Sequence, residues 1–94
     1  MTTAHPEGLD ALIAAGWTLR ADEKAIVRTY KFPDFVRAFG FMSACALVAE
    51  RMDHHPEWSN VYKRVEVRLS THDAGGLTAL DFELARKMNS FAGA

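Results

Sequence analysis

Apolar residues recur every three or four positions in three separate stretches of the chain, which is the spacing of one face of an α-helix. The first stretch follows Pro6 and ends at Gly16, a residue type that often closes a helix in the left-handed conformation. The second begins at Asp34, a favourable N-cap, and the third begins near residue 79, just after Thr78. The pattern therefore predicts three helices, one near each end of the chain and one in the middle.

Between these helices, apolar and polar residues alternate with the period of two that is typical of half-buried strands. The first pair of runs covers 17–19 and 25–32, and the second covers 60–62 and 65–69 with residues 63–64 as a polar turn. Each pair is close enough in sequence to form an antiparallel hairpin. The chain is therefore expected to form an α+β fold, a four-stranded antiparallel sheet with helices packed on one face, in the order α-β-β-α-β-β-α.

The central helix carries an apolar stripe that we expect to face the core. The stripe follows i, i+4, i+7 spacing and consists of Phe35, Phe39, Met42, Ala46 and Ala49. Cys45 lies in an apolar run of the same helix, so we expect it to be a small core residue and not a nucleophile.

The length of 94 residues suits one domain, residues 1–94, and 49% of the residues are apolar. A domain of this size buries roughly 60 to 65% of its unfolded surface, so some apolar surface is expected at a subunit interface. Eleven basic and twelve acidic residues give a net charge of −1, which argues against nucleic acid as a partner. One cysteine excludes an internal disulfide, and neither a signal segment nor an 18-residue apolar run is visible. We therefore expect a cytoplasmic protein without a membrane span.

Two histidines, two carboxylates, a proline and a tryptophan follow one another in the stretch Asp53-His54-His55-Pro56-Glu57-Trp58. Pro56 disfavours the helical conformation of the residue before it, so the central helix has to end here. The partial negative charge of a helix C-terminus favours a protonated imidazole, and the carboxylates of Glu50 and Asp53 act in the same direction. The two histidines are therefore candidates for acid and base chemistry near neutral pH.

A third histidine, His72, lies at the end of the second predicted hairpin in Ser70-Thr71-His72-Asp73. If the fold brings His72 beside His55, the histidines line one pocket. Three interpretations compete: an ordinary polar loop, a zinc site of three histidines and a carboxylate, and a metal-free acid–base site. The HxH and HxxxH spacings of zinc sites are absent, and no nucleophile elbow surrounds Ser70 or Thr71. General acid–base catalysis by histidine is the interpretation that these residues favour.

Taken together, the motifs resemble the pterin-4a-carbinolamine dehydratase family. The resemblance rests on the run from Glu50 to Trp58, on Asn60-Val61-Tyr62, on Ser70-Thr71-His72-Asp73, and on Gly76-Leu77-Thr78 with Asp81. Gly16-Trp17 and the helix entry Phe32-Pro33-Asp34-Phe35 extend it over essentially the whole chain. His-His-Pro alone is common, but the spaced set is specific.

The resemblance implies a hydro-lyase that dehydrates 4a-hydroxytetrahydropterin to quinonoid dihydropterin, which recycles a tetrahydrobiopterin-type cofactor after an aromatic amino-acid hydroxylase has used it. It implies catalysis by His54, His55 and His72, without a metal or any other cofactor. The expected substrate contacts are Asp53, Pro56, Trp58, Ser70, Thr71 and Asp73. Glu50 and Asp81 are expected to support the site, with Asp81 reaching from the start of the last helix toward His72 or the pterin.

We expect His55 to be the main acid–base residue at the C4a hydroxyl, His72 to assist it, and His54 to handle the ring proton or to orient the substrate. The resemblance also implies a homodimer or homotetramer and an aromatic amino-acid hydroxylase as a possible partner. The alternative is a protein-interaction module, a dimerisation cofactor or an assembly factor, with little or no catalysis. The intact histidine set favours the enzyme.

Overall fold

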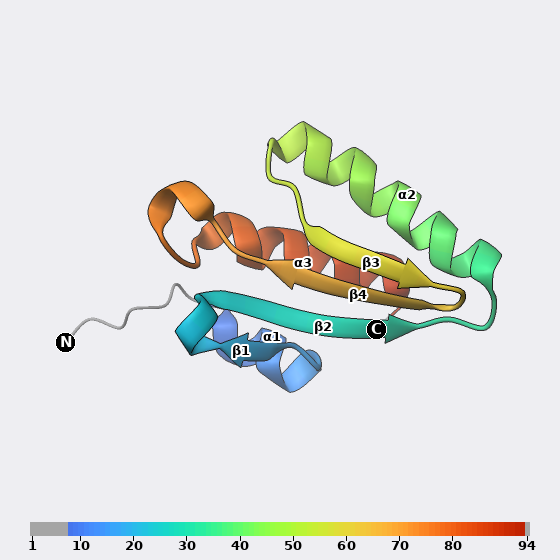
Figure 1. The fold of residues 1–94 in the computed structure, drawn as a ribbon, viewed down its shortest axis with the longest axis horizontal. Helices are drawn as coiled ribbons and strands as arrows, with labels where there is room; N and C mark the ends of the chain where they lie inside the picture. Colours follow the sequence, from blue (N-terminus) through green and yellow to red (C-terminus); the bar gives the residue numbers. More distant parts are fainter. Residues whose placement is uncertain (1–7, 94) are drawn as a thin grey trace.

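Three α-helices and four strands follow one another in the predicted order in the computed structural model (Figure 1). The structure describes residues 8–93, apart from the side chains of Glu23 and His72. The elements are α1 (Leu9–Ala15), β1 (Thr18–Arg20), β2 (Ala25–Lys31), α2 (Phe35–Met52), β3 (Glu57–Val61), β4 (Arg64–Leu69) and α3 (Ala79–Ala92). Two short 3-10 helices, η1 (Ala21–Glu23) and η2 (His72–Ala74), lie in the connections.

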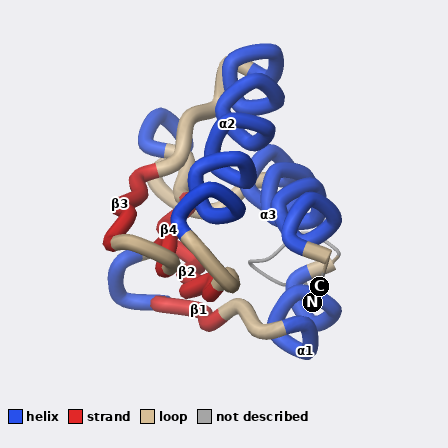
Figure 2. Tube along the Cα trace, turned by 90° about the vertical axis from the view of Figure 1, so that its right-hand side faces the viewer, coloured by secondary structure: helices blue, strands red, loops and turns tan. Residues whose placement is uncertain are grey.

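All strand pairs are antiparallel, and the order across the sheet is β1-β2-β4-β3. The end-on view shows the three helices on the same side of the sheet (Figure 2). The predicted α+β architecture, with helices covering one face, is therefore confirmed.

The second hairpin turns one residue earlier than the sequence predicted. Val61 pairs with Arg64, so the turn is Tyr62-Lys63 and not residues 63–64. Tyr62 takes the left-handed conformation, with φ 53°. The side-chain amide of Asn60 donates to the carbonyl oxygens of Tyr62 at 3.1 Å and Arg64 at 2.9 Å. These two bonds stabilise the turn. They could not be predicted from the alternation of apolar residues, because they come from a polar side chain.

The predicted start of α2 is confirmed, because the side chain of Asp34 accepts a hydrogen bond from the backbone N–H of Arg37 at 2.7 Å. This helix spans 18 residues. Across residues 8–93, no helix combines the length and the apolar character that crossing a membrane requires.

The predicted core stripe of α2 is right only in part, because Ala49 is buried and Met42 packs partly buried against the core, but the other three residues are exposed. Phe35 and Phe39 are 45% and 56% exposed, and Ala46 is also exposed. The buried face consists of Ala38, Phe41, Cys45 and Ala49. Apolar residues surround most of this helix, so periodicity alone could not choose the face. Packing against the sheet determines which face of α2 is buried. The small side chains of that face allow the helix to approach the sheet closely, and one aromatic ring fills the remaining space.

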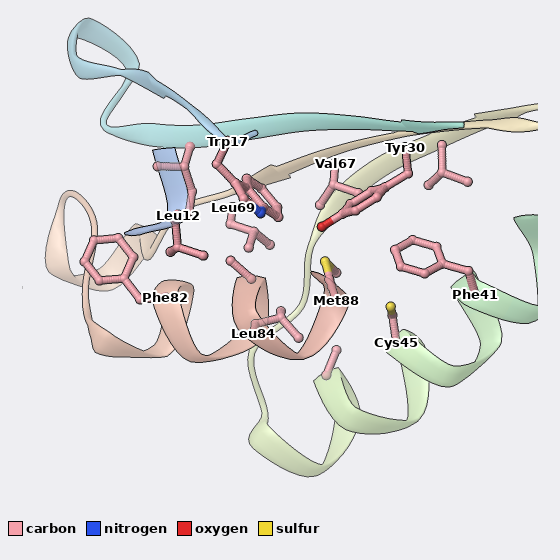
Figure 3. Close-up of a cluster of buried hydrophobic side chains, with 14 of the residues drawn as sticks. Leu12, Trp17, Tyr30, Phe41, Cys45, Val67, Leu69, Phe82, Leu84 and Met88 are labelled. Atoms are coloured by element: carbon pink, nitrogen blue, oxygen red, sulfur yellow. The ribbon is translucent and has the colours of Figure 1, made fainter. Parts of the chain in front are cut away.

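That ring belongs to Phe41, which lies beside the ring of Tyr30 (Figure 3). Its centroid is 4.8 Å from that of Tyr30 and 5.0 Å from that of Phe32. Cys45 packs in the same core and is fully buried, as predicted. Burial raises the pKa of its thiol to about 12. A thiol in this environment stays protonated, which fits a structural role.

One polar group lies inside the core at the end of α3. The side-chain oxygen of Asn89 accepts hydrogen bonds from Trp17 Nε1 at 3.0 Å, from Arg28 at 2.7 Å, and from the Tyr30 hydroxyl. The Arg28 guanidinium also lies 4.5 Å from the centre of the Tyr30 ring. Through these three donors, Asn89 links α3 to β2 and to the residue that precedes β1.

Candidate active site

The chain leaves α2 through a residue in the left-handed conformation, Asp53, with φ 53° and ψ 42°. Its N–H donates to the carbonyl of Glu50 at 3.1 Å, and the N–H of His54 donates to the carbonyl of Ala49 at 3.0 Å. This pair of bonds usually accompanies a glycine, and aspartate is one of the few other residues that tolerates the conformation. The helix end predicted from Pro56 is therefore confirmed, and the backbone entering the two histidines is fixed.

His54 turns inward and pairs with the first carboxylate of α3. Its Nε2 lies 2.6 Å from Oδ1 of Asp81, and the two side chains are 9% and 0% exposed. A buried carboxylate of this kind needs several hydrogen-bond donors to offset the loss of water. We refer to His54 and Asp81 as the buried dyad.

Two further donors complete the surroundings of Asp81. Its Oδ2 accepts from the hydroxyl of Thr71 at 2.7 Å and from the backbone N–H of Thr78 at 2.9 Å. The two threonine hydroxyls are 2.8 Å apart, and that of Thr78 also accepts from the N–H of Leu80 at 3.3 Å. The predicted capping box at the start of α3 is thus present. One carboxylate therefore caps α3 and holds His54.

The other ring nitrogen of His54, Nδ1, has no hydrogen-bond partner among the described residues. In that part of the chain, no buried side-chain nitrogen or oxygen that is closed to solvent lacks a partner. Nδ1 is therefore the ring atom through which His54, 8% exposed, reaches the surface. An ionised carboxylate only accepts hydrogen bonds, so we assign the proton to Nε2 and the lone pair to Nδ1.

His55 points to the opposite side of the chain and stays in contact with solvent. Its Nε2 lies 2.8 Å from Oε1 of Glu50, and these side chains are 57% and 81% exposed. Successive side chains of an extended segment point in opposite directions, which explains the difference between the neighbours. The adjacent histidines therefore occupy two environments, one buried and held by Asp81, the other exposed beside Glu50.

The other predicted contact residues lie around this pair or at the end of β4. Asp53 is exposed at the helix end, Pro56 is half-buried, and Trp58 packs against the core from β3. Ser70 and Thr71 are half-buried.

Asp73 is exposed in η2, the short helix that His72 begins. The side chain of His72 lies outside the described part of the structure. The expected pocket shared by His55 and His72 therefore stays a prediction.

The segment after β4 is a closed loop beside a cavity. The backbones of Thr71 and Gly76 exchange hydrogen bonds at 3.0 and 3.2 Å, which closes the loop that contains η2. The adjoining cavity has a volume of about 350 Å³. Its lining consists of Lys24, Glu57, Arg68, Ser70, Thr71, Gly75 and Gly76.

The sequence did not single out the true partner of Asp81. The capping-box pattern of Thr78 and Asp81 was visible, but the expected contact was His72 or the pterin and not His54. The role of Thr71 as a donor to Asp81 was also missed, because nothing in a local pattern links positions ten residues apart.

Among the described residues, no group of three or more histidine, cysteine, aspartate or glutamate side chains is arranged to hold a metal ion. The side chain of His72, the third histidine of the zinc interpretation, lies outside these residues.

Residues 2–91 match the family model described as pterin 4 alpha carbinolamine dehydratase. The chain belongs to this family. It is 67% identical over 76 residues to a protein from Bradyrhizobium diazoefficiens, provisionally named pterin-4-alpha-carbinolamine dehydratase, with 81% of this chain and 76% of that protein covered. A relative from Novosphingobium aromaticivorans with the same provisional name is 61% identical over 84 residues, covering 87% of this chain and 88% of the relative.

Solved structures show the same fold. A crystal structure described as a transcriptional coactivator/pterin dehydratase from Brucella melitensis superposes with a TM-score of 0.86 and 47% identity, covering 98% of this chain and 100% of that one. A pterin dehydratase-like protein identified as a RuBisCO assembly factor in the alpha-carboxysome has a TM-score of 0.72 and 18% identity, covering 84% and 92%. The second likeness concerns the fold alone. The dehydratase resemblance seen in the sequence is thus confirmed at the level of the family.

Proposed function

We propose that this protein dehydrates 4a-hydroxytetrahydropterin to quinonoid dihydropterin and so serves in tetrahydropterin recycling. Family membership supports this activity. The observation that carries the proposal is the buried dyad, in which the carboxylate of Asp81 holds His54 at 2.6 Å and leaves its second nitrogen accessible. A histidine oriented by a buried carboxylate is a common arrangement for proton transfer.

The reaction needs one acid and one base. The C4a–oxygen bond breaks with its electron pair, the hydroxyl takes up a proton and leaves as water, and a ring nitrogen gives up its own proton. No electrons enter or leave the system overall. Two histidines in different protonation states can supply both steps, and no covalent intermediate is required.

The two environments suggest a division of labour. Nδ1 of His54 carries the lone pair and would accept the ring proton, because Asp81 stabilises the imidazolium that results. His55 lies beside the carboxylate of Glu50 on the exposed side of the chain, and we assign to it the donation of a proton to the C4a hydroxyl. His72 would assist His55, and we retain that role as part of the proposal.

The substrate contacts are proposed to come from both sides of the histidines. Asp53 and Pro56 would provide backbone and side-chain contacts at the helix end, and Trp58 would form an apolar wall. Ser70, Thr71 and Asp73 would bound the pterin on the side of β4. Two of these, Ser70 and Thr71, line the cavity of about 350 Å³, which supports their assignment.

The assay that tests the proposal follows the dehydration of synthetic 4a-hydroxytetrahydropterin by purified protein. We expect turnover well above the spontaneous rate, and no loss of rate after treatment with a chelator, since the proposed chemistry uses histidines only. Rates equal to the spontaneous reaction would contradict the proposal, and inhibition by the chelator would favour the zinc interpretation.

The exposed apolar residues of α2 support an oligomer. Phe35, Val36, Phe39 and Leu47 are 45%, 78%, 56% and 69% exposed on one helix. Monomeric proteins rarely leave such a group uncovered. We propose a homodimer or homotetramer in the cytoplasm, with an aromatic amino-acid hydroxylase as a possible partner, and gel filtration with and without the hydroxylase tests both.

The same exposed surface is the observation that favours the alternative, a protein-interaction module. The Brucella melitensis protein, 47% identical, is described as a transcriptional coactivator as well as a pterin dehydratase. An interaction module without catalysis would bind a partner but would leave the carbinolamine rate at its spontaneous value. The dehydration assay therefore separates the two functions.

A further inference from the structure

The face of the sheet that the helices leave open carries two adjoining cavities. Glu66 and Arg68 alternate along β4 with the buried Val65 and Val67, so their side chains point away from the helices. The larger cavity, about 680 Å³, extends over all four strands. The smaller one is the cavity of about 350 Å³ beside Ser70 and Thr71. They share the ion pair of Glu57 with Arg68, whose nitrogen and oxygen atoms are 2.8 Å apart.

The charge of this region is opposite to that of the whole chain. Three cationic side chains, Arg20, Lys24 and Arg68, and two carboxylates, Glu57 and Glu66, line the two cavities, a balance of +1, whereas the chain carries −1. Arg28 also lines the larger cavity, but its guanidinium donates to Asn89 on the helix side of the sheet. Clustered charge of one sign in a concave site favours a ligand of the other sign.

Lys24 is the cation placed to meet such a ligand in the smaller cavity. It occupies the left-handed conformation that ends η1, with φ 55°. Its stem packs over Gly76, so a Cβ on residue 76 would lie 3.7 and 3.8 Å from Cβ and Cδ of Lys24. No acidic side chain pairs with Lys24 in the part of the chain that the structure describes. Lys24 lines the smaller cavity, and its ammonium is therefore available to an anion there.

The smaller cavity also adjoins the buried dyad. Thr71 lines the cavity, and its hydroxyl donates to Asp81 at 2.7 Å. Asp81 in turn lies 2.6 Å from Nε2 of His54. Two hydrogen bonds therefore connect the wall of this cavity to the histidine proposed as the base. In a pterin, C6 follows C4a and N5 around the ring, so a substituent at C6 starts close to the reacting atoms.

We propose that the smaller cavity binds the side chain that the pterin carries at C6, and that Lys24 selects a side chain ending in a phosphate or carboxylate. This inference rests on the proposed function, because it takes the pterin as the ligand. The hydroxyl of Ser70 can donate to the oxygens of the same side chain, whereas that of Thr71 already donates to Asp81. Glu57 lines the same cavity, but its carboxylate forms the ion pair with Arg68, which weakens its repulsion of an anionic ligand.

The test compares pterins with neutral and charged side chains. Dissociation constants are measured by titration for 7,8-dihydroneopterin and its monophosphate, which differ in one charged group, and for 7,8-dihydrofolate, whose longer aminobenzoyl-glutamate side chain ends in carboxylates and so tests the carboxylate. We expect the monophosphate to bind about five- to tenfold more tightly than the neutral parent, as a partly exposed charge-assisted contact would give. In Lys24→Gln this preference should fall below about twofold, while Lys24→Arg and the distant control Lys87→Gln should retain it.

Equal affinities of the wild-type protein for the neutral and charged ligands would overturn the proposal. An unchanged preference in Lys24→Gln would overturn the assignment to Lys24. The dehydration assay is run with a 6-methyl carbinolamine, which lacks a charged side chain at C6. It therefore tests the proposed dehydration independently of the C6 subsite. A charge preference without any dehydration contradicts the proposed function alone, whereas dehydration without a charge preference contradicts the C6 subsite alone.

Discussion

His54 and Asp81 are 27 residues apart in the sequence, and their side chains meet at 2.6 Å in the interior. The contact joins the end of α2 to the first turn of α3, so the packing of these helices sets its geometry. Asp81 also caps α3 and accepts from Thr71. Activity and folding should therefore depend on one carboxylate, and the predictions below separate the two effects.

Replacing Asp81 by asparagine removes the charge that orients His54 but keeps a side chain of the same size. We expect kcat for carbinolamine dehydration to fall on the order of 10²-fold, since the amide cannot stabilise the imidazolium. The free energy of unfolding should fall by about 1 to 3 kcal/mol, because a buried network loses one of its acceptors. Glu83→Gln, on the exposed side of the same helix, is the control. A kcat within twofold of wild type in Asp81→Asn would remove the dyad from the mechanism.

Thr71 should act as a positioning residue through Asp81. Thr71→Val keeps the shape of the side chain and removes the hydroxyl, whereas Thr71→Ser keeps the hydroxyl. We expect kcat to fall about tenfold in the valine variant, the cost of a hydrogen bond to a charged group. The serine variant should recover most of this loss. Steady-state kinetics of both variants provide the measurement, and equal losses in the two would point to packing instead.

The two neighbouring histidines should differ in their effect on stability. His54→Ala leaves the buried carboxylate of Asp81 with one donor fewer, so we expect a loss of about 3 kcal/mol or more in urea unfolding. His55→Ala breaks only an exposed pair with Glu50 and should cost less than about 1 kcal/mol. Both variants should lose on the order of 10² to 10⁴ in rate. If His55→Ala retains wild-type turnover, its role as the acid is wrong.

Asn89 should be important for stability and not for chemistry. Asn89→Ala leaves the buried donors of Trp17 and Tyr30 and the guanidinium of Arg28 without their shared acceptor. We expect a loss of about 2 to 4 kcal/mol in the free energy of unfolding, because unpaired buried donors keep their desolvation cost. The fluorescence of the two tryptophans, Trp17 and Trp58, during urea unfolding measures this loss. Ser90→Ala, an exposed neighbour on the same helix, should unfold like the wild type.

Stability should decline in alkaline solution because two buried groups stay protonated in the folded chain. Burial raises the pKa of Cys45 from 9.0 to about 12. Burial also raises the pKa of Tyr30 above its ordinary value of 10.0, although the nearby Arg28 charge acts in the opposite direction. The unfolded chain releases these protons first, so their contribution is complete below pH 9 and is lost as the pH rises toward the folded values.

Urea unfolding at a series of pH values from 9 upward measures this effect. Once Cys45 ionises in the unfolded chain, we expect it to lower the free energy of unfolding by roughly 1.4 kcal/mol for each pH unit. Cys45→Ala should reduce the slope by about that amount, whatever it does to the absolute stability. Ser43→Ala on the exposed side of α2 should leave the slope as it is.

Much of the fold could be predicted from local patterns. Alternation and helical periodicity predicted three helices and four strands in the right order, although β3 (Glu57–Val61) begins three residues before the expected run 60–62. Asp34 and Thr78 predicted two helix starts, and Pro56 predicted the end of α2. These features depend on residues that are close in sequence, and the backbone responds to them directly. The spaced histidine and aspartate motifs also identified the family, because a resemblance needs only the order and spacing of residues.

The buried face of α2 was decided by tertiary packing. Both the predicted stripe with Phe35 and Phe39 and the observed face with Phe41 and Cys45 are apolar, so the pattern did not discriminate between them. The contact of Phe41 with the rings of Tyr30 and Phe32 decides which of the two faces is buried. Those rings come from β2 and the residue just after it, so they are not part of the helical pattern. The same holds for Asn89, whose three donors come from distant positions.

The site divides in the same way. The sequence by itself determined which chemical groups are present, that a helix ends immediately before His54, and that His54 and His55 must point in different directions. Only the tertiary structure decided that His54 is the inward one and that its partner is Asp81. Asp81 could contact either histidine as far as the sequence shows. The packing of α3 against α2 brings the first turn of α3, and with it Asp81, beside His54. A carboxylate is stable when buried there because imidazole, hydroxyl and backbone donors converge on it.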